Sequence, residues 1–314
     1  MPEILRGNML QKEQYGQPYS ESILILFAAI APSLWATSFL AVKYVVVSIP
    51  PFTAAAFRFI IVVAMLWALL FALRIRIRQR PALRDVPLLA ATGLCQTTFY
   101  FALQYWGLQL TTAANGAVLV NTRPIFVTLI AALFLHEIIT WRKGLGVALA
   151  FAGVVTIIGY DALALLNGGS EQLLGNIALL LNAVSGAVGL VLTKRVIARF
   201  GPFPSLVYTN TFGALGLIAF SAVELAERGS LPAATLPPWL ALIYQAVFTT
   251  IIAHVLWNTV LNQKDASWAA VFLYITPVMT ALLSWAFLAE QPTWNLIAGA
   301  ALVFLGTHLV TQRK

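Results

Sequence analysis

The chain has 314 residues, of which 60% are hydrophobic and 10% are charged, and its mean hydropathy is +0.86. These values exclude an ordinary soluble globular protein. The net charge of +8 does not indicate nucleic-acid binding, because most of the cations lie in the short segments between long apolar runs.

Ten apolar runs of about 20 residues predict an all-α integral membrane protein with ten transmembrane helices, since about 20 residues cross a hydrocarbon core of roughly 30 Å. In chain order the runs are 22–46, 50–73, 86–108, 112–135, 144–161, 174–194, 204–224, 238–260, 266–288 and 294–311. Residues 1–21 are polar and are expected to form a cytoplasmic tail. No cleavable signal is expected, because the first run is itself long enough to span.

The chain contains a duplication. The stretch that begins at Pro124 matches the stretch that begins at Pro277, and a constant shift of 153 positions pairs identical Pro, Phe-Leu, Glu, Thr-Trp and Gly residues. Shared hydrophobicity does not explain matches of these residue types. The pattern predicts two five-helix repeats, 22–161 and 174–311.

The basic residues predict that the two repeats are inverted. Lys and Arg favour the cytoplasmic side of the membrane. With the N-terminus inside, most of the 19 basic residues fall in cytoplasmic segments, and the external loops hold only Arg228. Because five spans is an odd number, the second repeat then runs upside down relative to the first, which is a common architecture of secondary transporters.

The doubled Pro…Phe-Leu-x-Glu…Gly…Gly pattern, together with Trp35, Lys43 and Arg58, resembles the drug/metabolite transporter superfamily and its EamA-type ten-helix exporters. The resemblance covers about residues 22–311. It implies an inner-membrane carrier of small metabolites that works by alternating access. The sixth span departs from the pattern, since it has Ser185-Gly186 where many members carry an aromatic residue.

Arg123 is the main candidate for substrate binding. It lies at the centre of the fourth span beside Pro124, and no Asp or Glu lies in the middle of any span. A cation without a partner is costly at this depth and marks a functional site by default. We expect its guanidinium to bind a substrate carboxylate. The structural alternative is a hydrogen bond to carbonyls freed by a proline bend; Pro124 and Pro277 are both expected to kink their helices.

Two spans carry polar stripes at helical spacing, which should face a cavity or another helix rather than lipid. These are Gln96, Tyr100 and Gln104 in the third span and Thr250, His254 and Asn258 in the eighth. His254 is a candidate for binding or proton coupling, because it titrates near neutral pH; a satisfied structural histidine is the alternative.

The remaining candidates are aromatic, amide and charged residues near span centres or ends. Stacking or cavity-lining roles are assigned to Trp35, Asn121, Asn182, Trp257 and Tyr274, with packing as the alternative. Arg58 and Lys43 lie near the outer ends of their spans, and Lys43 is expected to snorkel. Arg58 can snorkel or cap carbonyls at the interface; it is a gate or structural candidate, with direct substrate contact as the alternative. Glu137 and Glu290 are expected to cap the helix that follows each of them, or to act as gates.

The predicted function is secondary export of small metabolites, namely amino-acid-like zwitterions or anions, from a bacterial-type inner membrane with both termini cytoplasmic. Alternatives are a broad exporter of aromatic or cationic drugs, a non-transporting scaffold or an intramembrane enzyme. An enzyme is disfavoured because His136-Glu137 begins HEIIT rather than HExxH, and GxGxxG and Walker motifs are absent from the sequence.

No cofactor, metal or nucleic acid is expected. The expected partners are a small-molecule substrate, the lipid bilayer and protons as a candidate coupling ion, in a monomer or homodimer.

Overall fold

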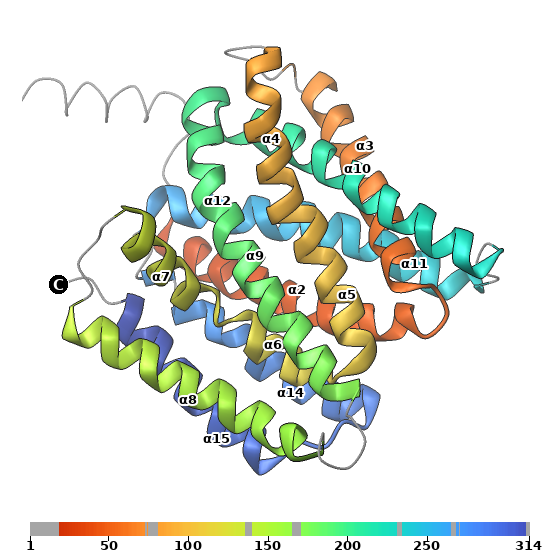
Figure 1. Cartoon of the computed structure of the whole chain (residues 1–314). Helices are drawn as coiled ribbons and strands as arrows, with labels where there is room; N and C mark the ends of the chain where they lie inside the picture. Colours follow the sequence, from red (N-terminus) through yellow and green to blue (C-terminus); the bar gives the residue numbers. More distant parts are fainter. Residues whose placement is uncertain are drawn as a thin grey trace, which may run out of the picture.

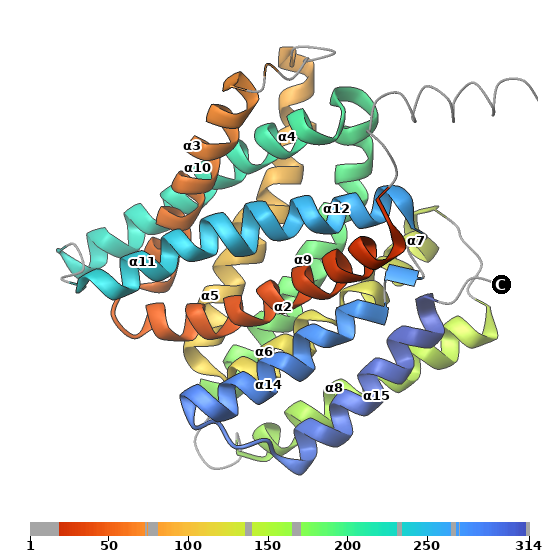
Figure 2. The ribbon, with the colours of Figure 1, turned by 180° about the vertical axis from the view of Figure 1, so that it is seen from behind.

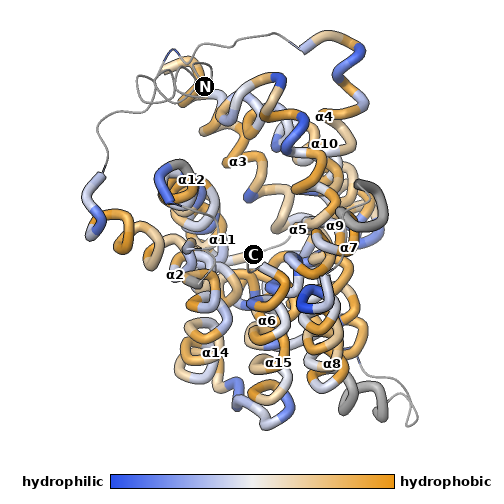
Figure 3. Tube along the Cα trace, turned by 90° about the vertical axis from the view of Figure 1, so that its left-hand side faces the viewer, coloured by the Kyte–Doolittle hydropathy of each residue, from blue (hydrophilic) through white to orange (hydrophobic). Residues whose placement is uncertain are grey.

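The computed structural model describes residues 19–72, 74, 81–135, 140–164, 171–230, 234–264, 268–269 and 271–311, and all regular structure in these residues is helical. The helices pack into one bundle (Figure 1). Figure 3 shows hydrophobic residues along most of each helix, with strongly hydrophilic positions mainly near helix ends. This distribution is the one expected of helices surrounded by lipid.

The elements follow one another through short connections. In chain order they are α2 (Glu21–Val46), α3 (Pro51–Ala72), η1 (Leu83–Asp85), α4 (Val86–Gly93), η2 (Leu94–Phe99), α5 (Tyr100–Leu110), α6 (Ala113–Val120), α7 (Arg123–Leu135), α8 (Trp141–Ala164), α9 (Glu171–Phe200), α10 (Pro202–Arg228), α11 (Leu236–Tyr244), η4 (Gln245–Ile252), α12 (Ala253–Gln263), η5 (Val271–Tyr274), α14 (Ile275–Leu288) and α15 (Trp294–Thr311). Only Gly201 separates α9 from α10, and its φ of 84° lies in the left-handed region that glycine adopts without a Cβ clash.

Eight helices in the described residues are long and apolar enough to cross a membrane. The prediction of ten spans is therefore met only in part. The expected run 144–161 lies in α8, which is not among the eight, and the described apolar helix of the expected run 266–288 is the shorter Phe272–Leu288. Within the eight, 33% to 56% of each apolar window is buried, so the rest faces outward, as lipid-exposed helices require.

The third and eighth spans share a local irregularity. In the third span α4, η2 and α5 form one continuous rod, and in the eighth α11, η4 and α12 do the same. Both η2 and η4 are π-helical, and they end at Phe99 and Ile252, which are 153 positions apart. Since π-helical turns are rare and concentrate at functional sites, their recurrence at equivalent positions identifies this level of the bundle as a place to search for the site.

A turn interrupts the fourth span, and the ninth span begins with a 3-10 segment. Asn121 and Thr122 form a turn between α6 and α7, so Pro124 lies in the first turn of α7. In the second repeat the 3-10 segment η5 precedes α14, and Pro277 lies in the first turn of that helix. The expected bends are thus helix starts, where a proline costs no hydrogen bond because the first amides have no partner in the helix.

The last helices of the two repeats, α8 and α15, lie side by side (Figures 1 and 2). The repeated glycines form their contact. A Cβ on Gly146 would lie 2.6 Å from the Gly306 carbonyl oxygen, and one on Gly153 would lie 2.6 Å from the Gly299 carbonyl oxygen. The first glycine of each helix thus contacts the second glycine of the other. The two helices are therefore antiparallel and related by a two-fold operation. Small residues allow such close backbone approach between membrane helices.

Candidate functional site

Arg58 of α3 is the centre of a buried polar network. Its side chain is 3% exposed, and among the described residues its guanidinium donates only to uncharged side-chain oxygens. The shortest bonds run from Nη2 to Thr250 Oγ1 at 2.8 Å and from Nη1 to Gln245 Oε1 at 3.0 Å. The other acceptors are the hydroxyls of Ser38, Thr249 and Tyr105. Of the possibilities left open by the sequence, Arg58 therefore does not snorkel, because packing from α2, α5 and η4 closes it off from the membrane surface.

Aromatic rings and a shared acceptor complete the surroundings of Arg58. The guanidinium carbon lies 4.9 Å from the ring centroid of Phe101 and 5.7 Å from that of Phe59, within the range of cation–π attraction. Tyr105, which is fully buried, also donates to Gln245 Oε1 at 2.7 Å. Every observed bond of Arg58 is thus made inside the protein, which indicates a structural role.

We expect Arg58→Ala to lower the free energy of unfolding by about 2–3 kcal/mol, the cost of one or two buried acceptors that lose their donor. Thermal unfolding of the detergent-purified protein measures this, with Arg228→Gln, a change at an exposed arginine, as the control. If the melting temperature of Arg58→Ala is unchanged and transport is lost, Arg58 takes part in transport instead.

Arg123 differs from Arg58 in having no such network. It is the first residue of α7 and is half-buried, and its guanidinium carbon lies 4.5 Å from the ring centroid of Tyr100. Its guanidinium makes no hydrogen bond or ion pair with any other described residue. The cation is therefore positioned by stacking while its N–H groups stay available.

Gly186 of α9 makes room for this pair. A Cβ at this position would lie 2.7 Å from Arg123 Nε and 2.9 Å from Tyr100 Cδ2. The side chain of Asn182, one turn earlier, donates to the backbone carbonyl of Tyr100, and Ser185 Oγ donates to the Cys95 carbonyl at 2.7 Å. These bonds supply donors to carbonyls in and next to the π-helical turn. The departure of the sixth span from the family pattern thus coincides with the space that Arg123 and Tyr100 occupy.

Trp35, His254 and Trp257 form an aromatic cluster between α2 and α12. The Trp35 ring centroid lies 5.4 Å from that of His254 and 5.4 Å from that of Trp257. His254 Nδ1 lies 2.6 Å from the Thr250 carbonyl oxygen, and since a carbonyl only accepts, Nδ1 carries the proton. Thr250 also accepts from Arg58, and the charges of both Arg58 and Arg123 act on His254. The two arginines and the aromatic cluster therefore belong to one region.

Several expected residues point elsewhere. Asn121 donates to the Ala117 carbonyl of the preceding helix α6 at 2.7 Å, and the Tyr274 hydroxyl donates to the Phe304 carbonyl at 3.2 Å. Asn258 is exposed, so the polar stripe of the eighth span does not face one cavity along its whole length. In the third span Gln96 packs against Gly189 and Gln104 is 5% exposed, and the Oε1 atoms of both have no hydrogen-bond partner among the described residues.

Glu290 caps a helix, although not the one expected. The Ala113 amide, at the start of α6, lies 3.2 and 3.0 Å from its two carboxylate oxygens. The expectation that it caps the following helix, α15, is therefore wrong: Thr293 Oγ1 accepts from an amide there. Lys43, expected to snorkel, instead donates to the Thr111 carbonyl at 2.8 Å. Glu137 lies outside the described residues.

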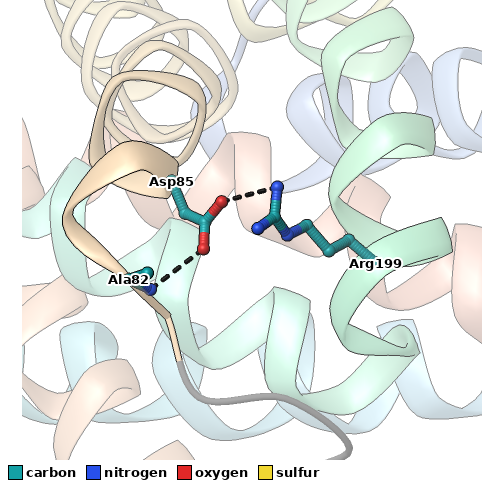
Figure 4. Close-up of polar contacts among 3 residues, drawn as sticks. All are labelled: Ala82, Asp85 and Arg199. Carbon is teal, nitrogen blue, oxygen red and sulfur yellow. Dashed lines mark hydrogen bonds and ion pairs between the residues drawn. The ribbon is translucent and has the colours of Figure 1, made fainter.

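Three anchoring residues were not predicted. Gln245 bonds both Arg58 and Tyr105, and Glu224 of α10 accepts from the Thr53 amide at 2.7 Å, which caps the start of α3. Asp85, 2% exposed, lies 2.6 Å from Arg199 Nη1 and accepts from the Ala82 amide at 2.9 Å (Figure 4). An acidic residue beside a helix start was the available signal for Asp85. Gln245 and Glu224 gave no such signal, because the groups that they bond lie far away in sequence.

The arrangement offers chemistry for binding rather than for bond-making. No group of three or more His, Cys, Asp or Glu residues in the described ranges could hold a metal ion. The free guanidinium, the aromatic rings and the neutral amides are the groups that recognise a small organic solute.

Comparison with known proteins identifies the relatives of this chain. The profile of the EamA-like transporter family matches residues 22–159 and 173–312. An uncharacterized transporter of Archaeoglobus fulgidus is 28% identical over 92% of this chain and 97% of its own length. The uncharacterized transporter YoaV of Bacillus subtilis is 28% identical over 90% and 95%.

A protein of Streptantibioticus cattleyicolor named as a probable terminal-alkyne amino-acid exporter is 25% identical over 75% of this chain and 76% of its own length. A solved crystal structure aligns over 93% of this chain and 97% of that chain, with a TM-score of 0.60 and 25% identity. The two matched segments together cover most of the chain. The chain therefore belongs to the EamA-like transporter family, whose members are multi-pass membrane transporters.

Proposed function

We propose that this transporter is a ten-helix secondary exporter of small amino-acid-like zwitterions or anions, and that it works by alternating access between two inverted five-helix repeats. The observation that carries the proposal is Arg123: a half-buried guanidinium, stacked on Tyr100, whose N–H groups have no acceptor among the described residues. A substrate carboxylate supplies the missing acceptor in bidentate geometry.

The neighbours of Arg123 suit the rest of such a substrate. Trp35 and Trp257 offer aromatic faces and edges to an apolar side chain. The neutral tautomer that has its proton on Nδ1 leaves His254 Nε2 as an acceptor for an ammonium or hydroxyl group. The similarity to a relative named as an amino-acid exporter supports the same substrate class.

The aromatic cluster also favours a second candidate, a broad exporter of aromatic or cationic drugs, because its rings can stack on planar ligands. Charge argues against a cationic substrate. Arg58 and Arg123 both act on the region around His254, and neither forms an ion pair with a described carboxylate. A cation entering there meets two like charges.

Counterflow in proteoliposomes tests the proposal. Vesicles loaded with a mixture of unlabelled amino acids should accumulate external radiolabelled amino acids, while vesicles loaded with the corresponding decarboxylated amines should not. With radiolabelled amines outside instead, accumulation in the amine-loaded vesicles, together with no accumulation of amino acids, would favour the drug exporter. Absence of any counterflow across both sets would contradict secondary transport of these solutes.

The arrangement in the membrane gives a separate prediction. Single cysteines at Arg78 and near either terminus should react only with reagents applied from the cytoplasmic side, and cysteines at Gly168 and Arg228 only with external reagents. Labelling of intact cells with an impermeant maleimide measures this in a Cys95→Ala background. External labelling at position 78 contradicts the proposed ten spans and the cytoplasmic termini.

A further inference from the structure

A cavity separate from the Arg123 region lies where α6, α9 and α15 begin. It has a volume of about 380 Å³, within the range of small-molecule sites. Its polar lining is dominated by amide side chains and one acid: Asn115, Gln172, Glu290, Gln291, Thr293 and Asn295. Asn115 precedes Arg123 by eight residues and lies on the other side of the Asn121–Thr122 turn. The orientation that the basic residues predict places this cavity at the external end of the bundle.

The carboxylate of Glu290 has unused acceptor capacity in this cavity. The only hydrogen-bond donor to it among the described residues is the Ala113 amide, whereas two carboxylate oxygens accept about four bonds. Lys43 acts on Glu290 electrostatically, but its ammonium donates to the Thr111 carbonyl, and the two side chains form no ion pair in the described residues. Glu290 therefore presents a half-buried negative charge with room for a further donor.

The backbone holds Glu290 in this position by a turn that is unfavourable for its sequence. Ala289 adopts a φ of 55°, in the left-handed region that favours glycine, and its neighbour Glu290 donates its amide to the Ser284 carbonyl at 3.2 Å. A non-glycine residue in this conformation is strained, and such strain concentrates at ligand sites. The turn at the end of α14 thus directs the carboxylate to the start of α6.

The amides around Glu290 complement a zwitterion. Asn115 is 7% exposed, and its amide nitrogen has a single described bond, to Thr111 Oγ1 at 3.5 Å. Gln172 and Asn295 lie in the first turns of α9 and α15, where backbone amides and the helix dipole favour a negative group. A ligand with an ammonium group and a carboxylate has a partner for each charge.

We propose that this cavity is a second solute site, in which Glu290 binds the ammonium group of the transported zwitterion before its release. The identity of the ligand rests on the proposed export function; the preference of the site for an ammonium group rests on Glu290 alone. Two sites of opposite polarity then lie along one path: the substrate carboxylate is bound at Arg123 and its ammonium group at Glu290.

Protection of a cysteine in the cavity tests this site. In a Cys95→Ala background, Asn295→Cys is labelled with a polyethylene glycol maleimide in nanodiscs, in the presence of L-alanine, its decarboxylated analogue ethylammonium, or its deaminated analogue propionate. L-alanine and ethylammonium should each slow labelling by tenfold or more at saturation, and propionate should not. Equal protection by propionate, or no protection by any of the three, overturns the proposal.

Three further variants assign the effect to the carboxylate. Glu290→Gln keeps an acceptor for the Ala113 amide and should abolish protection by ethylammonium, while Glu290→Asp should weaken it. Glu227→Gln, at an exposed acid, should leave protection unchanged. Full protection in a folded Glu290→Gln protein overturns the site. Arg123→Gln distinguishes failure of the export proposal from failure of the second site. If this variant transports normally, the proposed function fails. Protection of the cavity cysteine by ethylammonium in the same variant still measures the site at Glu290.

Discussion

Replacing Arg123 by Gln is expected to abolish transport of carboxylate-bearing solutes and to leave the protein folded. A charged hydrogen bond contributes about 1.5–3 kcal/mol, so the loss of a bidentate pair should raise the Kd by about 100-fold, at about 1.4 kcal/mol for each tenfold change. Arg123→Lys keeps the charge but not the fork, and should lose about tenfold. Binding by thermal shift and flux in proteoliposomes measure both changes.

The expected stability of the Arg123 variant follows from the same geometry. Its guanidinium has no hydrogen bond to another described residue, so its removal orphans no acceptor there and costs only the stacking on Tyr100. Arg142, an exposed arginine that stacks on Trp141, is the matched control, and Arg142→Gln should transport normally. If Arg123→Gln instead melts at lower temperature while the surviving protein keeps its affinity, Arg123 is structural.

Gly153→Leu should disrupt the pairing of α8 with α15. The atom that a side chain would meet is a backbone carbonyl oxygen, which cannot rotate away as a flexible side chain can. Overpacking typically costs 1–3 kcal/mol, so Gly153→Ala should lower the free energy of unfolding by about that amount and Gly153→Leu by more. Gly299→Ala, at the partner glycine, should behave alike because it faces the same contact from the other side.

Ala152→Leu is the matched control, since Ala152 is the exposed neighbour of Gly153 on the same helix. It adds the same side chain without meeting α15 and should leave the melting temperature within about a degree. Fluorescence-detected size-exclusion chromatography after heating compares the variants. Equal melting curves for Gly153→Leu and Ala152→Leu would show that the close contact of α8 with α15 is not required for stability.

The sequence predicted those features of the fold that occur in both halves of the chain. Residues 153 positions apart predicted that Gly146 and Gly153 have counterparts in Gly299 and Gly306, and the crosswise pairing of these glycines agrees with the two-fold relation that inverted repeats imply. The breaks at Pro124 and Pro277 were predicted as bends. Both prolines lie in the first turn of a helix instead, because a turn precedes α7 and a 3-10 segment precedes α14.

The contacts of the site depended on information that no local pattern contains. Snorkelling and a structural role were both open for Arg58, since its distance from the helix end gave no sign that Gln245 and Thr250 would surround it. The π-helical turns lie within the predicted polar stripes, and in the third span Gln96 packs on Gly189 and Tyr100 on Gly186, so both residues face α9. A one-residue insertion of this kind shifts every later side chain around the helix axis and is not visible in hydrophobic periodicity.

The membrane voltage acts on the uncompensated cations of this bundle. Neither Arg58 nor Arg123 forms an ion pair in the described residues, so the empty carrier has net positive charge within its spans. Moving one charge across a full potential of 100 mV changes the free energy by about 2.3 kcal/mol. A conformational change that moves these arginines through part of the field is favoured in one direction and opposed in the other. A carboxylate on Arg123 cancels one of the two charges, so the loaded and empty carriers should respond to voltage to different extents.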